Sequence, residues 1–161
     1  MSKVFIIILL AGFMLLEVNC QENINKEVQV IKPSFIKING SLILKTKDKS
    51  CLIADDAIDY EAYLSSNNKI IAVETLLMSN LQTIRIYLKN SNDCYSPMKD
   101  AFSTKVWGIL SKQKNFKIED ISHPRMKFIK WIDNKQLVIE LYGEIDSKVI
   151  DENITYLISS P

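Results

Sequence analysis

Short apolar runs separated by asparagine- and aspartate-containing turns recur along this chain, and this pattern constrains the fold most. The clearest turn is Asn39-Gly40, which separates the apolar residues 35–38 from residues 42–44. Both turn residues tolerate the positive φ angles of a type I′ turn, so the pattern predicts a β-hairpin. Residues 65–68 and Asp133-Asn134 separate later apolar runs in the same way. The chain is therefore predicted to be rich in antiparallel strands.

The remaining strands are predicted from apolar runs and period-two alternation. They cover residues 51–54, 60–64, 69–75, 82–88, 126–132, 136–142 and 154–158. Residues 67–74 and 133–140 have a similar order of turn, lysine, aliphatic strand and glutamate. Two ordinary hairpins in one sheet explain this similarity, and blades of a small propeller are the alternative.

One segment changes to a helical period. Its apolar residues fall on a single stripe, namely Met98, Ala101, Phe102, Val106, Ile109 and Leu110. Ser96 is a suitable N-cap, and Pro97 suits the first helical position. We therefore predict an amphipathic helix over residues 97–112. The expected fold class is α+β, with an antiparallel sheet of about seven or eight strands and this helix packed on one face.

The first twenty residues are predicted to be an export signal. Lys3 gives a short positive start, and an apolar run extends to Leu16. About 13 apolar residues form a helix of about 20 Å, which is too short for a hydrocarbon core of about 30 Å. We therefore interpret residues 1–20 as a signal peptide, residues 21–33 as a flexible lead-in, and residues 34–158 as a single globular domain.

The processing of Cys20 has two main interpretations. Ordinary cleavage after Cys20 leaves Gln21 as the new N-terminus, with Val18 and Cys20 at the −3 and −1 positions. Lipidation of Cys20, as in a bacterial lipoprotein, is the alternative, although Glu17 and Asn19 fit that signal poorly. An uncleaved N-terminal anchor is the third interpretation. The expected location is the periplasm, the cell envelope or the extracellular space, and contact with a membrane surface is expected only if Cys20 is lipidated.

Cysteine usage agrees with export. Processing removes or acylates Cys20, so Cys51 and Cys94 remain, and an oxidising compartment favours a disulfide between them. Two buried free thiols are the alternative. A metal site is not expected, because the chain has one histidine and no C-x-x-C motif.

Charge and motifs exclude several function classes. The formal net charge is +1, which does not favour binding to nucleic acid. The chain contains no phosphate-binding glycine loop, dinucleotide fingerprint, nucleophile elbow or zinc-protease motif, so no cofactor is expected. The single histidine, His123, precedes Pro124 in a predicted loop, and we interpret it as an ordinary loop residue without a catalytic role.

The densest acidic cluster consists of Asp55, Asp56, Asp59 and Glu61. Paired carboxylates can hydrolyse glycosides or bind a hard cation, but we interpret the cluster first as solvated loop charges. Trp131, Trp107 and Tyr63 are the candidate binding residues, because tryptophan and tyrosine are enriched in interfaces. Core packing is the alternative that their spacing favours. Trp131 is expected to face away from Phe128 on its strand, which leaves one side of that strand less completely packed.

The sequence therefore predicts an exported, non-enzymatic protein of the cell envelope that binds another protein, in the manner of an inhibitor or an immunity protein. This analogy rests on size, disulfide and the lack of a catalytic motif. The first alternative is a small secreted hydrolase that uses the cluster from Asp55 to Glu61. The second is a structural lipoprotein held to a membrane through Cys20.

Overall fold

The computed structural model describes residues 33–78 and 81–159, and within them it confirms the α+β fold. The predicted signal peptide, nearly all of the lead-in and Cys20 lie outside these residues. The elements are β1 (Ser34–Ile38), β2 (Ser41–Lys45), β3 (Ser50–Ala54), β4 (Asp59–Leu64), β5 (Ile70–Met78), β6 (Leu81–Lys89), β7 (Tyr95–Pro97), α1 (Phe102–Lys114), a 3-10 helix (Ile118–Asp120), β8 (Ser122–Trp131), β9 (Gln136–Ile145) and β10 (Lys148–Leu157).

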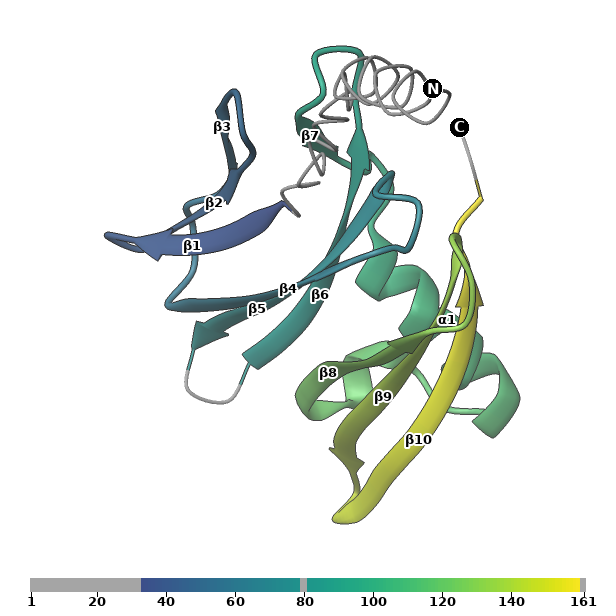
Figure 1. Ribbon diagram of the computed structural model, residues 1–161. Coiled ribbons are helices and arrows are strands. Elements are labelled where there is room, and N and C mark those ends of the chain that lie inside the picture. Colours follow the sequence, from purple (N-terminus) through teal and green to yellow (C-terminus); the bar gives the residue numbers. More distant parts are fainter. Residues whose placement is uncertain (1–32, 79–80, 160–161) are drawn as a thin grey trace, which may run out of the picture. The chain divides into compact units, whose positions relative to one another are not determined.

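The strands form two sheets instead of the single sheet expected. A three-stranded antiparallel sheet has the order β1-β2-β3, and a seven-stranded sheet has the order β10-β9-β8-β6-β5-β4, with β7 paired to β6 (Figure 1). Apart from the short strand β7, the larger sheet consists of two three-stranded meanders, β4-β5-β6 and β8-β9-β10. Between them the register contains one parallel pair, Gln82 with Arg125. The two meanders can therefore diverge on either side of this contact.

Strand β5 contributes to two hydrophobic cores. Ile70 and Ala72 pack with α1 and with the inner face of β8-β9-β10 in the first core. Ile71 and Val73, which point the opposite way, pack beneath β2 and β3 in the second core. Figure 1 shows β4, β5 and β6 between these two sets of strands. Both faces of the β4-β5-β6 meander are thus covered.

The predicted turns at Asn39-Gly40 and Asn67-Asn68 are confirmed. Asn39, Gly40 and Asn68 have φ angles of 49°, 76° and 56°, as hairpin turns of this kind require. A further hairpin, between β9 and β10, was not predicted, because residues 143–153 are polar. Its turn is Asp146-Ser147, with φ angles of 48° and 63° and no glycine.

The helix begins later than predicted. Ser96 and Pro97 belong to β7, where Pro97 pairs with Tyr87. The backbone N–H of Met98 donates to the carbonyl oxygen of Ile86 at 2.7 Å. Helix α1 begins at Phe102, and its N-cap is Ala101. Proline lacks an N–H group and therefore suits the end of an edge strand as well as a helix start. The prediction of an N-cap at Ser96 was wrong for this reason.

The two similar sequence segments form two ordinary hairpins of one sheet, and their turns touch. The side-chain oxygen of Asn134 accepts hydrogen bonds from the hydroxyl of Ser66 at 2.7 Å and from the backbone N–H of Asn67 at 2.8 Å. These bonds join the β4–β5 turn to the β8–β9 turn. The tips of the two meanders are therefore fixed to each other at this end.

Gly143 on β9 should not tolerate a side chain. A Cβ atom at this position would lie 2.6 Å from Cγ2 of Ile121 and 3.5 Å from the ring of Trp107. We expect Gly143→Ala to lower the free energy of unfolding by about 1–3 kcal/mol, because the core is overpacked. Denaturant unfolding measures this change.

The matched control is Gly108→Ala in α1. Its Cβ would meet only Cδ1 of Ile118, at 4.0 Å. Alanine is favoured over glycine in a helix interior by about 1 kcal/mol, so this variant should be as stable as the wild type or more stable. Equal destabilisation by both substitutions would show that close packing at Gly143 is not the cause.

Candidate functional site

Two of the three predicted binding residues, Tyr63 and Trp131, come together in one aromatic cluster. The ring of Tyr63 on β4 stacks on Phe128 of β8, with centroids 4.1 Å apart. The ring of Trp131 lies 5.7 Å from that of Phe128, and its indole N–H donates to the backbone oxygen of Tyr63 at 3.2 Å. Both Tyr63 and Trp131 are half-buried. Their main contacts therefore join the two meanders of the larger sheet.

The expectation that Trp131 faces away from Phe128 was wrong. The register of β8 against β9 shifts between Phe128 and Lys130, as in a β-bulge. In a regular strand, residues three positions apart point to opposite faces. A bulge adds one residue, so Phe128 and Trp131 point to the same face. Trp107, the third candidate, is 5% exposed and lies in the first core, so it offers almost no surface for a partner.

The acidic cluster from Asp55 to Glu61 is divided among different partners. Nη1 of Arg85 lies 2.7 Å from each carboxylate oxygen of Asp56, and this bond lowers the pKa of Asp56. Nζ of Lys37 lies 2.6 Å from Asp59 and lowers the pKa of that carboxyl group. A general acid requires a raised pKa, so these two ion pairs give the hydrolase hypothesis no support.

A buried carboxyl group that sequence analysis missed is Glu74 on β5. It is 5% exposed and lies directly opposite Glu61 of β4. One carboxylate oxygen accepts the backbone N–H of Phe128 on β8, and the other accepts the side-chain N–H of Gln82 at 2.8 Å. Glu74 therefore supplies a hydrogen bond to β8 near the point where that strand leaves β6.

Burial raises the pKa of Glu74, and the negative charge of Glu61 raises it further. The hydrogen bond from Phe128 and the positive charge of Lys127 act in the opposite direction. Burial also raises the pKa of Tyr63, whose hydroxyl donates to Glu61 at 2.5 Å. A cavity of about 120 Å³ opens beside these groups, lined by Asp59, Tyr60, Glu61, Glu74, Leu76 and Gln82.

His123 lies in β8 instead of the predicted loop. Its φ angle is 52°, and it occupies a register shift between Ser122 and Arg125. The hydroxyl of Ser122 donates to the backbone oxygen of Glu144 at 3.1 Å. The two residues therefore do not form the nucleophile–base pair of a catalytic triad.

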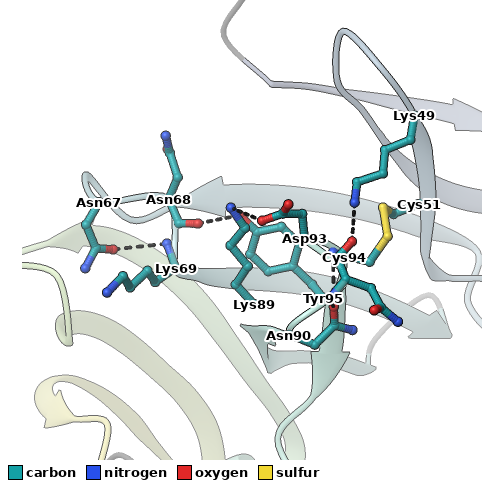
Figure 2. A network of polar contacts seen from close by, with 11 residues as sticks. Lys49, Cys51, Asn67, Asn68, Lys69, Lys89, Asn90, Asp93, Cys94 and Tyr95 are labelled. Carbon is teal, nitrogen blue, oxygen red and sulfur yellow. Dashed lines mark hydrogen bonds and ion pairs between the residues drawn. A yellow bond between two sulfur atoms is a disulfide. The ribbon is translucent and has the colours of Figure 1, made fainter.

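The predicted disulfide between Cys51 and Cys94 is confirmed, and it joins β3 to the loop before β7. Figure 2 shows the polar network around it. The side-chain oxygen of Asn90 accepts the backbone N–H of Cys94 at 3.1 Å, and the hydroxyl of Tyr95 donates to the backbone oxygen of Asn68 at 2.6 Å. Lys49 donates to the backbone oxygen of Asn92 across the same junction. The network fixes the small sheet to the β6–β7 loop.

The small sheet has an apolar outer face that sequence analysis also missed. Ile36, Ile43 and Leu52 lie opposite one another across β1, β2 and β3. Leu52 is 56% exposed, and Ile36 and Ile43 are half-buried. The neighbouring residues Leu42 and Leu44 point to the other face and are buried. We call Ile36, Ile43 and Leu52 the apolar row.

The sequence contains a signal for this row. Residues 42–44 and 51–53 are continuously apolar, whereas an antiparallel strand with one solvated face alternates. A continuous run predicts apolar character on both faces of the sheet. The second core covers one face, and among the described residues the other face remains accessible to solvent.

The described residues contain no group of three or more histidine, cysteine, aspartate or glutamate side chains placed to hold a metal ion. No helix in this part of the chain combines the length and apolar character that crossing a membrane requires. The chain matches no protein-family model, no curated protein and no solved structure. The two candidate sites are the apolar row and the cavity beside Glu74.

Removal of the disulfide should weaken the contact between the small sheet and the second core. The two cysteines are 43 residues apart, and closing a loop of this length contributes about 3–4 kcal/mol in the chain-entropy model. We expect Cys51→Ala combined with Cys94→Ala to lower the free energy of unfolding by about this amount. Denaturant unfolding of the oxidised wild type and the double variant measures it. An unchanged unfolding midpoint would contradict the prediction.

Glu74 should make stability depend on pH. Its pKa in the folded state is raised above the ordinary value of 4.5. Its contribution is therefore fully present below that value and is lost as pH rises through the folded-state pKa. We expect the stability of Glu74→Gln relative to the wild type to increase as pH rises above about 4.5, because the glutamine stays uncharged. The glutamine oxygen can still accept the backbone N–H of Phe128, and rotation of the Gln82 amide lets its oxygen accept from the new NH₂ group.

Glu61→Gln provides the control for this effect. It removes the opposite carboxylate, so the pKa of Glu74 should fall and the pH dependence should become weaker. Denaturant unfolding at several pH values compares the three proteins. Parallel curves for the wild type and Glu74→Gln would show that the carboxyl group of Glu74 does not titrate differently in the folded state.

Proposed function

We propose that the protein is an exported, non-enzymatic module that binds another protein through the outer face of its small sheet. The observation that carries the proposal is the apolar row, in which three aliphatic side chains cross three strands and one is more than half exposed. Apolar side chains gathered on one face are typical of binding surfaces, whereas apolar residues scattered singly over a surface are ordinary.

The location of the row supports this interpretation. The opposite face of the same sheet is fixed by the second core and by the disulfide from Cys51. A rigid sheet presents its side chains in one geometry, which reduces the entropy lost when a partner binds. The disulfide also agrees with export to an oxidising compartment, because disulfides persist there and are rare in reducing ones.

A photocrosslinking amino acid at Leu52 tests the proposal. Val149 on β10 is exposed to a similar degree and provides the matched control. In cells that produce the protein, we expect a discrete crosslinked adduct with another protein from position 52 and none from position 149. Ile43→Lys in the same chain should abolish the adduct, because it places a charge in the centre of the row.

Circular dichroism and denaturant unfolding must show that Ile43→Lys leaves the fold intact. Two results would oppose the proposal: no adduct from position 52, or equal adducts from positions 52 and 149. The second result would indicate unspecific contact of exposed side chains.

A further inference from the structure

We infer that the partner presents an apolar patch bordered by carboxylate groups, and that Lys45 and Lys47 contact those carboxylates. This inference rests on the proposed binding function of the small sheet. It follows from the distribution of charge around the apolar row.

The small sheet carries an excess of lysine. Between Ser34 and Ala54 there are four lysines and one acidic residue, Asp48. Two of the lysines are occupied within the molecule. Lys37 forms an ion pair with Asp59 at 2.6 Å, and Lys49 donates to the backbone oxygen of Asn92. The other two, Lys45 and Lys47, are exposed and form no hydrogen bond or ion pair with another described residue.

These lysines lie at one end of the outer face of the small sheet, so its two ends differ in charge. Lys45 follows Ile43 by two residues on β2, so both side chains point to the same face of the strand. It lies between Ser34 and Ser50, in the row next to the apolar one. Lys47 lies two residues farther along the chain, in the β2–β3 turn. At the other end, Ile38 pairs with Ser41, and the exposed Asp55 follows Ala54, which pairs with Leu42.

An apolar centre with charged groups at its rim is the usual composition of a protein interface. Charges at a rim steer encounter and set orientation more than they add affinity. A partner with carboxylates facing Lys45 and Lys47 would dock in one orientation. It would also neutralise the two lysines of the small sheet that have no partner among the described residues.

A second copy of this chain is a different occupant, which the adduct mass distinguishes. A parallel stack of two identical faces about Ile43 would set Lys45 against Lys45, and like charges repel. An antiparallel stack would bring Lys45 toward the end where Asp55 follows β3. An anionic membrane fits less well, since two lysines contribute only about 1 kcal/mol each near such a surface.

The experiment uses the full chain with the photocrosslinker at Leu52 in cells that produce it. Lys45→Glu with Lys47→Glu reverses the charges of these two lysines. Lys117→Glu with Lys148→Glu is the matched control, because it changes the net charge equally at exposed lysines outside the small sheet. We expect the yield of adduct to fall about fivefold or more with the first pair and to change by less than about twofold with the second.

The captured protein is then purified and titrated with the wild-type chain. Its affinity should decrease as NaCl rises from about 0.05 M to about 0.5 M, because rim charges are screened. If position 52 yields no adduct in any chain, the proposed function itself is wrong. If the adduct forms but neither Lys45→Glu with Lys47→Glu nor salt reduces binding, binding by this face stands and the inferred carboxylate rim is wrong.

Two other outcomes would also overturn the inference. One is an adduct with the mass of two copies of this chain. The other is binding of the purified chain to vesicles that contain phosphatidylglycerol, lost on Lys45→Glu with Lys47→Glu, in the absence of a protein adduct. Each would assign the face to a different occupant.

Discussion

Burial of β5 on both faces is the constraint on which the rest of the structure depends. The six residues from Ile70 to Thr75 are all buried, although a strand of an antiparallel sheet commonly has one solvated face. Each face therefore needs its own cover. The small sheet supplies one cover, and α1 with β8-β9-β10 supplies the other. The disulfide and the Asn134 contacts fix these covers to the turns and loops of the β4-β5-β6 meander.

Local chemistry in the sequence predicts much of this fold. Asn39-Gly40 specifies a hairpin because few residues accept positive φ angles. The expected processing of Cys20 left Cys51 and Cys94 as the predicted disulfide pair, and the structure joins them. Where two local structures suit the same residues, the prediction was wrong. Ser96-Pro97 suits both a helix start and the end of an edge strand, and pairing with β6 decides for the strand. Asp146-Ser147 forms a tight turn without the glycine that usually reveals one.

The candidate sites depend more on contacts between distant residues, which the sequence hides. Glu74 resembles a solvated strand residue until β8 crosses near it and donates the Phe128 N–H. Trp131 changes face because of one bulge, and its indole N–H then donates to the backbone oxygen of Tyr63. Such features require knowledge of which strands meet, and hydrophobic periodicity within one strand does not contain that information.

The apolar row shows how one sequence pattern leads to two outcomes. Strand β5 and the strands β2 and β3 all contain continuous apolar runs, and all are apolar on both faces. In β5 both faces are packed, so its run is explained by stability. In the small sheet the second core accounts for Leu42, Leu44 and Ile53, but it leaves Leu52 more than half exposed. Packing within the described residues does not account for the exposed side chain of Leu52, and it is this residue on which the proposed binding surface rests.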